Sequence, residues 1–493
     1  MSIELPIEEA PVRLPTVWEA LIPIIFMMFS LVVGIFVWDV SPHIPLLLSV
    51  CVAIMVAMRL GYKWKVIETG MLDAVRLALQ AIVILLVIGT IIASWIAGGI
   101  VPTLIYYGLN LLAPEYFLVA ACGICSIISI ASGNAWTAAG TIGIAIMGIG
   151  FGLGIPPEMV AGAVISGAYF GDKISPLSES TNLAPGIVGV DLFEHIRYML
   201  YTTIPALVIS LILFTILGFT VTADLTNTAA NNLTLQQDLK EIFVISPWLL
   251  LVPASIVLVM IFRIPAFPGL MIGSILGVLC AIFVQDADPS FVLGALYDGY
   301  SIEVTNPTLS ELLNNGGIIS VFATVSLVII AMCFGGILEF TGIFQTLVMN
   351  IVKLAKTTKS LIIATVATCI TGNVVGCDQY MSIIIPGRMY AEEYRKRGIK
   401  GKVLSRTLED AGTMTSPLIP WNTCGAFMAT TLGVSTFSYL PYTFLCILSP
   451  IIAITYAVTG YTIEYYEDGD APKKVKKNGA PMKSRRFKLV KRF

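Results

Sequence analysis

Two polar segments, GDKISPLSESTN (Gly171–Asn182) and EDAGTMTSPLIPWNT (Glu409–Thr423), interrupt long apolar stretches of this sequence. Each places acidic residues and then Ser-Pro-Leu between two apolar runs. Proline lacks an amide hydrogen and ends an α-helix, so we expect each segment to break a helix that its flanking runs would otherwise continue. The helix breaks are predicted at Pro176 and Pro417.

The composition of the chain is that of a membrane protein. Of its 493 residues, 57% are hydrophobic and 12% are charged, whereas soluble domains carry about 25% charged residues. Apolar runs long enough to span a bilayer follow one another along the chain. The clear spans are Leu21–Trp38, Ile44–Arg59, Leu72–Ala97, Met199–Val221, Pro247–Phe262, Ala266–Val284, Ile318–Glu339 and Pro441–Gly460. This pattern predicts an all-α membrane protein and excludes a soluble enzyme.

The basic residues indicate how the chain crosses the membrane. With the N-terminus in the cytoplasm, all but two of the 29 Lys and Arg residues fall in cytoplasmic segments. The exceptions are Lys240, in an outer loop, and Lys173, in the first break. Such a distribution follows the positive-inside rule, so we expect residues 1–20 and the basic tail 463–493 in the cytoplasm. We expect the tail to lie on the anionic inner leaflet, with no nucleic-acid partner.

A second pair of motifs precedes the breaks. Gly133-Asn134 stands about 42 residues before the first Ser-Pro-Leu, and Gly372-Asn373 stands about 44 residues before the second. The same order at nearly the same spacing indicates a duplication. The loop before the first pair lacks Lys and Arg, whereas the loop before the second carries three lysines. The two copies therefore enter from opposite faces, as in the inverted repeats of secondary transporters.

Each Gly-Asn pair is predicted at the tip of a re-entrant hairpin, because the apolar arms beside it are too short to span. Glycine permits the tight turn, and non-helical backbone at such depth requires surrounding protein or water. We therefore expect about 10 transmembrane spans in two inverted repeats, each with a re-entrant hairpin and a broken helix. The first repeat covers 21–221 (hairpin 116–150, broken helix 158–196), an outer linker covers 222–246, and the second repeat covers 247–462 (hairpin 360–386, broken helix 404–434).

The tips and breaks supply candidate ligands for a transported cation. Free carbonyls, hydroxyls and amide oxygens suit a hard cation, and charges persist inside a bilayer only when they are paired or wet. A carboxylate that takes either a cation or a proton is the minimum requirement for exchange. The predicted binding residues are Asn134, Asp172, Ser175, Ser178, Thr181, Asn182, Asn373, Asp378, Asp410, Thr415, Ser416, Asn422 and Thr423. The alternative role for Asp172 and Asp410 is a structural salt bridge.

Three stretches resemble the NhaC-type sodium/proton antiporter family. They are GDKISPLSESTNLAP (Gly171–Pro185), GCDQYMSIIIPGRM (Gly376–Met389) and LSRTLEDAGTMTSPLIPWNTCG (Leu404–Gly425), and the resemblance extends over most of Leu21–Tyr461. It implies a multi-pass protein of a bacterial or archaeal cytoplasmic membrane. It also implies that sodium leaves the cell as protons enter, with no cofactor. Members of the wider superfamily often dimerise, which implies a homodimer.

Some members of that family resemble exchangers that couple sodium to an organic acid such as malate or lactate. A carboxylate substrate requires a fixed positive group or helix N-termini beside the sodium ion, and Lys173 or Arg388 could provide the charge. An intramembrane aspartyl protease is excluded, because its Gly-x-Gly-Asp motif would need glycine at position 169, where this chain has Tyr169. A passive channel is disfavoured by the pair of broken helices.

Overall fold

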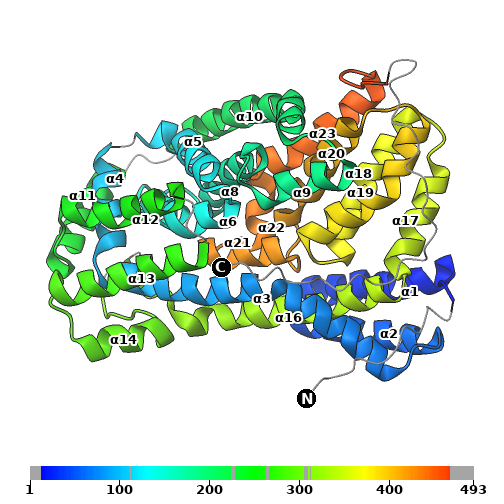
Figure 1. Cartoon of the computed structure of the whole chain (residues 1–493). Helices are drawn as coiled ribbons and strands as arrows, with labels where there is room; N and C mark the ends of the chain where they lie inside the picture. Colours follow the sequence, from blue (N-terminus) through cyan, green and yellow to red (C-terminus); the bar gives the residue numbers. More distant parts are fainter. Residues whose placement is uncertain are drawn as a thin grey trace.

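In the computed structural model, the described residues are 13–466 apart from 112, 224–227, 263–265, 305–308 and 311–312, and every regular element among them is a helix (Figure 1). The first elements are α1 (Val17–Val32), η1 (Val33–Val37), α2 (His43–Arg59), α3 (Trp64–Ala97), α4 (Ile100–Leu111), α5 (Pro114–Ser132), α6 (Ala135–Ala138), η2 (Ala139–Gly143), α7 (Ile144–Gly152), α8 (Pro157–Ile174) and α9 (Glu179–Val188). The middle elements are α10 (Leu192–Ala223), α11 (Thr228–Ile242), η3 (Pro247–Leu250), α12 (Leu251–Ile261), α13 (Ala266–Phe283), α14 (Pro289–Asp298) and α16 (Gly317–Phe340). The last elements are α17 (Ile343–Leu354), α18 (Thr358–Val375), α19 (Gln379–Lys396), α20 (Gly401–Leu408), η4 (Glu409–Thr413), η5 (Ser416–Leu418), α21 (Thr423–Leu432), α22 (Thr436–Tyr439), η6 (Leu440–Tyr442) and α23 (Phe444–Thr459). Positions 467–493 of the predicted tail and the first 12 residues lie outside the described part.

The described helices match the predicted all-α membrane class. Seven of them are long and apolar enough to cross a membrane, and the number rises to nine if each of two bent helix pairs counts as one span. This is fewer than the predicted total of about ten, because α2 and the apolar part of α13 have only 17 residues each and are classed with the shorter apolar helices.

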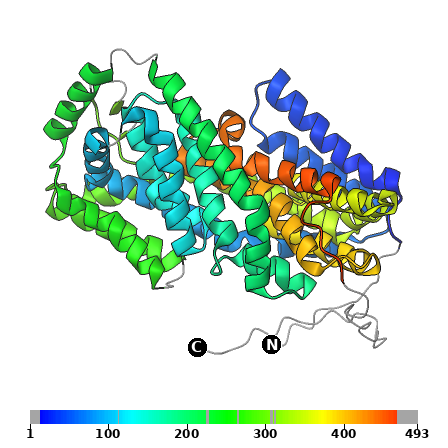
Figure 2. The same ribbon diagram turned by 90° about the horizontal axis from the view of Figure 1, so that it is seen from above.

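Two hydrophobic cores divide the molecule. Helices α5 and α8 lie apart from α1 and α2 in both ribbon views (Figure 1, Figure 2). One core surrounds α5, α7 and α8, and the other joins α1 and α2 to α16–α20. The long helix α3 contributes to both, with Ile67–Ile82 in one core and Ile84–Ala97 in the other. Because α3 is packed in both cores, its residues hold the two cores at a fixed distance from each other along the helix.

Helices α5 and α8 pack closely through two glycines one turn apart. A Cβ atom added to Gly167 would lie 2.2 Å from the carbonyl oxygen of Cys122, and one added to Gly171 would lie 2.5 Å from that of Ser126. Small residues four apart let helix backbones approach in this way. The contact fixes the end of α8, where the first break begins.

The first predicted tip lies at a helix end, but its arms are longer than expected. Gly133 has a left-handed backbone, with φ 70°, and ends α5, while Asn134 caps the next helix. The arms Pro114–Ser132 and Ala135–Gly152 have 19 and 18 residues, and each is long enough to span by itself. The premise that these arms are too short to span is therefore wrong.

The second predicted tip is misplaced. Helix α18 continues through Gly372 and Asn373 to Val375, and the chain turns only at Gly376–Asp378. Cys377 takes the left-handed conformation, with φ 57°, and Asp378 caps α19. The Gly-Asn pair was a misleading signal because Gly372 is an ordinary helical residue, whereas Cys377 provides the turn.

Both predicted helix breaks are present. Pro176 lies in the non-helical turn between α8 and α9, and Pro417 lies in the short 3-10 helix η5 between the π-helical turn η4 and α21. The first break is followed by a helix that stops at Val188, so the predicted range 158–196 extends into the start of α10.

A buried ion pair joins the segments around these breaks. Lys173 at the end of α8 bonds Asp410 in η4, and both side chains are fully buried. The Asp410 carboxylate also accepts a hydrogen bond from Thr202 of α10 at 2.8 Å and one from Ser449 of α23 at 3.1 Å. Arg406 lies 3.7 Å from its other oxygen. One carboxylate thus connects four parts of the chain.

We expect Asp410→Asn to lower the apparent melting temperature of the purified protein more than Lys173→Met. The first substitution leaves Lys173 and Arg406 buried without a counter-ion, a change that costs roughly 3–5 kcal/mol in buried pairs, whereas the second leaves Asp410 beside Arg406. The double variant should recover part of the loss, because the buried ammonium is then gone. A double variant less stable than Asp410→Asn would contradict this account.

Candidate cation-binding site

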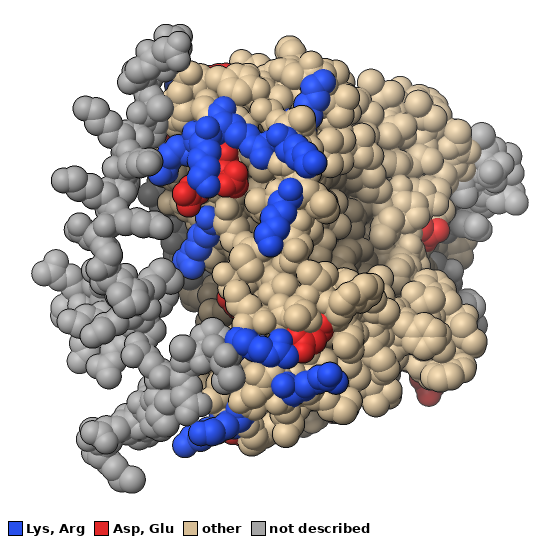
Figure 3. Space-filling view, turned by 90° about the vertical axis from the view of Figure 1, so that its right-hand side faces the viewer, with Lys and Arg blue, Asp and Glu red and all other residues tan. Residues whose placement is uncertain are grey.

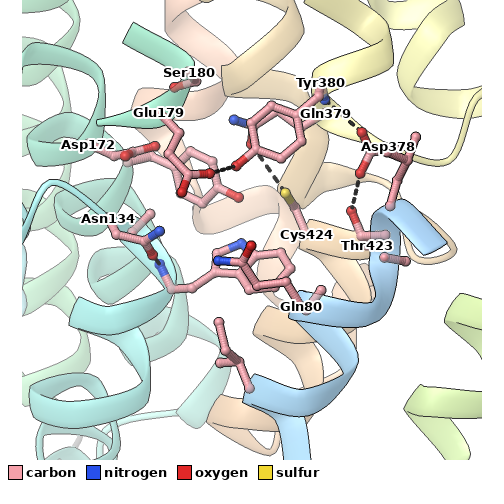
Figure 4. Close-up of a pocket in the computed structure, with 17 residues that line it drawn as sticks. Gln80, Asn134, Asp172, Glu179, Ser180, Asp378, Gln379, Tyr380, Thr423 and Cys424 are labelled. Carbon is pink, nitrogen blue, oxygen red and sulfur yellow. Dashed lines mark hydrogen bonds between the residues drawn. The ribbon is translucent and has the colours of Figure 1, made fainter. Parts of the chain in front are cut away.

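A cavity of about 90 Å³ lies where six segments of the chain meet (Figure 4). A buried water needs roughly 10–15 Å³ of such volume, so the cavity has room for several waters or a partly hydrated ion. It reaches the surface beside Glu179 and Tyr380, whose side chains are exposed. Its polar lining residues are Gln80, Asn134, Asp172, Glu179, Ser180, Asp378, Gln379, Tyr380, Thr423 and Cys424.

Two of these residues cap helices in the same way. Asn134 Oδ1 accepts hydrogen bonds from the backbone amides two and three residues later, at 2.9 and 3.1 Å. Asp378 Oδ1 does the same at 2.8 and 3.3 Å. Each follows a left-handed residue, and each is followed two residues later by an aromatic side chain that lines the cavity, Trp136 or Tyr380. The turn and cap geometry of Asn134 therefore recurs at Asp378 and not at Asn373.

Three carboxylates line the cavity, and no Lys or Arg is among its lining residues. Asp172 lies on α8 and is 7% exposed. Glu179 begins α9 and accepts a hydrogen bond from the Tyr380 hydroxyl at 2.6 Å. Asp378 accepts one from Thr423 at 3.2 Å. The cavity is therefore acidic and suited to a cation.

Helix N-termini help the carboxylates to carry charge. Glu179 lies in the first turn of α9, and Asp378 is the N-cap of α19. The partial positive charge at a helix N-terminus stabilises an acidic side chain placed there. These dipoles are thus directed at the protein's own carboxylates.

Uncharged polar groups complete the lining. Gln379 Oε1 accepts hydrogen bonds from Ser416 at 3.1 Å and from the Cys424 thiol at 3.2 Å. Gln80 reaches the cavity from α3 (Figure 4). Among the described residues, no three His, Cys, Asp or Glu side chains converge as a tight metal centre would require. A cation here would be held by a mixture of carboxylate, amide and water oxygens, as suits an ion that must leave again.

The structure brings four of the predicted binding residues together at the cavity: Asn134, Asp172, Asp378 and Thr423. The prediction omitted Glu179, Gln379, Tyr380 and Gln80 from the binding set. Glu179 lies inside the predicted break, and Gln80 is a polar residue in an apolar run. Both features of the sequence could have identified them as candidate binding residues. Gln379 and Tyr380 could not be predicted from a tip at Gly372-Asn373, because the turn that positions them lies at Gly376–Asp378.

Asn373 belongs instead to a buried polar cluster. Its amide donates to Gly412 O at 2.7 Å and to Thr415 at 2.8 Å, while its oxygen accepts from Ser382 and from Asn422. These bonds join α18, α19 and the second break. Asn373, Thr415 and Asn422 therefore hold the site together without lining it.

The remaining predicted residues mostly satisfy backbone groups at the breaks. Ser175 donates to Ile130 O at 2.8 Å, and Ser178 caps α9. Thr181 donates to the carbonyls of Asp172 and Lys173, and Asn182 donates to Pro176 O and Ser178 O. Ser416 donates to Gln379 and therefore acts on the cavity through it. Asp410 is occupied by Lys173, which corresponds to the salt-bridge alternative.

Comparison with known proteins identifies the family of this chain. The model of the Na+/H+ antiporter family matches residues 167–461. The chain is 42% identical to the Na+/H+ antiporter NhaC of Alkalihalophilus pseudofirmus over 88% of this chain and 94% of that protein. It is 41% identical to the Na+/H+ antiporter NhaC of Bacillus subtilis, over 87% and 95%. A malate-2H+/Na+-lactate antiporter of Bacillus subtilis is 39% identical over 92% and 97%. The chain thus belongs to the Na+/H+ antiporter family.

Proposed function

We propose that this chain exchanges sodium ions for protons across a membrane, and that Asp172, Glu179 and Asp378 bind both. The observation that carries the proposal is a cavity lined by three carboxylates and by no basic side chain. The relatives named Na+/H+ antiporters match nearly the whole chain. A carboxylate in such a cavity holds either a sodium ion or a proton, so binding of one releases the other.

The proposal includes an orientation and an internal repeat. Lys and Arg side chains gather on one hollowed end of the molecule (Figure 3). By the positive-inside rule this end faces the cytoplasm of a cell with an energised inner membrane, and the same rule predicts cytoplasmic termini. The matched turns at Asn134 and Asp378 support two inverted copies that meet at the cavity. A homodimer rests on the family resemblance alone.

Sodium-coupled exchange of an organic acid is the second candidate, supported by the malate-2H+/Na+-lactate relative. A carboxylate substrate needs a free positive group. Lys173 does not provide one, because its ammonium bonds Asp410 and Ser449 away from the cavity. Arg388 is not among the lining residues. The charge of the cavity therefore favours the inorganic cation.

We expect Asp378→Asn to reduce sodium-dependent proton flux in proteoliposomes by about tenfold or more, which corresponds to about 1.4 kcal/mol. Asparagine caps a helix as well as aspartate does, so the substitution removes charge and keeps the turn. The melting temperature should therefore hardly change. The matched control is Asp73→Asn, an exposed carboxylate of α3 that bonds Arg76 at 2.7 Å outside the cavity. Normal flux in Asp378→Asn would remove Asp378 from the site.

We expect the sodium concentration for half-maximal flux to rise as the pH falls, because protons and sodium compete for the same carboxylates. Flux measured at several pH values and sodium concentrations tests this. The maximal rate at saturating sodium should change less than the apparent affinity. An apparent affinity independent of pH would place the proton on a different group.

We expect neither malate nor lactate to be transported. The measurement is uptake of each labelled acid into proteoliposomes with and without a sodium gradient, beside the sodium-driven pH change. Sodium-coupled uptake of either acid, without a pH change driven by sodium alone, would establish the second candidate in place of the first.

A further inference from the structure

A second cavity, of about 320 Å³, lies beyond the cation site. Its walls are mostly apolar and include Ile96, Val101, Met147 and Phe151. Thr430 and Thr431 of α21 add hydroxyl groups, and that of Thr431 is buried without a hydrogen-bond partner among the described residues. A hydroxyl of this kind in the wall of a cavity is suited to bind water.

The same helices line both cavities. On α3, Ile84 lines the cation site and Ile92 the second cavity, and Trp136 and Ile144 have the corresponding positions along the α6–α7 arm. Eight helical residues span about 12 Å. On α21, Cys424 lines the first cavity and Thr430 the second. The two spaces are therefore stacked along one set of helices, about two turns apart.

An aromatic pair fills the space between them. The rings of Trp136 and Phe427 stack with centroids 4.1 Å apart and an interplanar angle of 15°. Trp136 lines the cation site, and Phe427 is fully buried midway along α21 between Cys424 and Thr430. Ile88 of α3 is fully buried at the same level of its helix. Phe427 and Ile88 therefore lie between the residues of their helices that line the two cavities.

The second cavity lies away from the basic end of the molecule. Helix α3 begins at Trp64, next to Lys63, and ends at Ala97, next to α4. The second cavity is lined by the later part of α3 and by α4. The basic end in Figure 3 is the right-hand side of Figure 1, where α17 lies, whereas α4 lies on the left-hand side of Figure 1.

We propose that the second cavity is the outer half of the ion pathway, and that the stacked Trp136 and Phe427 side chains are the gate between it and the cation site. The proposal rests on the proposed transport function and identifies the residues that close the site toward the outside. A single stacked pair is held by weak contacts, so it can separate and close again in each transport cycle. Loss of either ring should open the cation site to both sides at once.

Accessibility of introduced cysteines tests the gate. The nine native cysteines are replaced by serine or alanine, and Ala81→Cys then reports on the cation site while Met147→Cys reports on the second cavity. A membrane-impermeant thiol reagent is added to the outside of intact cells. We expect rapid labelling of Met147→Cys and slow labelling of Ala81→Cys. Adding Phe427→Ala or Trp136→Ala should raise the labelling rate of Ala81→Cys by about tenfold or more, which is about 1.4 kcal/mol in the closing equilibrium.

The matched control is Phe214→Ala. Phe214 is also a fully buried ring paired with another aromatic, Phe444, at 4.9 Å, but it lines neither cavity. It should leave the labelling of Ala81→Cys unchanged. Trp136→Phe keeps an aromatic ring, so its labelling rate for Ala81→Cys should stay close to that of the parent. It serves as a second comparison if the alanine variants do not reach the membrane.

Three outcomes would overturn the proposal. Ala81→Cys labelling that does not respond to either gate variant, or that rises equally with Phe214→Ala, would exclude the aromatic pair as the gate. Labelling of Met147→Cys only from the cytoplasmic side would exclude the outer assignment of the second cavity. Sodium-dependent proton flux is measured on the protein that keeps its native cysteines, with and without the gate substitutions. Gate-dependent labelling without any sodium-dependent flux in the native protein would refute the sodium function and leave the gate.

Discussion

The buried bond between Lys173 and Asp410 is the constraint on which the acidic site depends. Charged groups survive in a low-dielectric interior only when they are paired or solvated. Successive helical residues point about 100° apart, so α8 directs Lys173 to Asp410 and the adjacent Asp172 to the cavity. The ammonium is therefore neutralised by a partner from the second half of the chain, and it is not available to Asp172. This division leaves a cavity that is negative in spite of a lysine next to one of its carboxylates.

The helix ends around the cavity stabilise its carboxylates inside a membrane. The two breaks and the turn at Gly376–Asp378 bring the N-termini of α9, α21 and α19 to the cavity wall, where Glu179, Thr423 and Asp378 lie in first turns or cap positions. Oriented amides stabilise the carboxylates without adding a mobile counter-ion. Behind the wall, the Asn373 amide donates to Gly412 O in the second break, and the Asn422 amide from that break donates to Asn373 O in α18. The non-helical backbone is thus enclosed by protein on one side and by the cavity on the other, as a membrane interior requires.

Much of this could be predicted from sequence, since proline and glycine act locally. Pro176, Pro417 and Gly133 each indicated a helix end that the structure contains. The second turn could not be found in this way, because it is formed by Cys377 and a cysteine in the left-handed conformation has no sequence signature. The partner of Asp410 lies on another helix. Its salt bridge depended on packing across the bundle, which no local pattern specifies.

The two matched turns differ in one respect that bears on coupling. Asn134 and Asp378 have the same backbone geometry and the same capping bonds, yet only Asp378 carries a charge. At these matched turns, the second copy therefore contributes a titratable group and the first contributes a neutral amide, while Asp172 and Glu179 of the first copy add two further carboxylates to the cavity. The neutral turn leads to Trp136, which stacks on Phe427, whereas the charged turn leads to Tyr380, which bonds Glu179. The hydroxyl of Tyr380 donates to the Glu179 carboxylate, which sodium or a proton would occupy. Binding of either ion can therefore change this hydrogen bond and the position of the charged turn. The neutral turn contributes to the barrier through Trp136, so that the two matched turns have different roles, one in closure and one beside the bound ion.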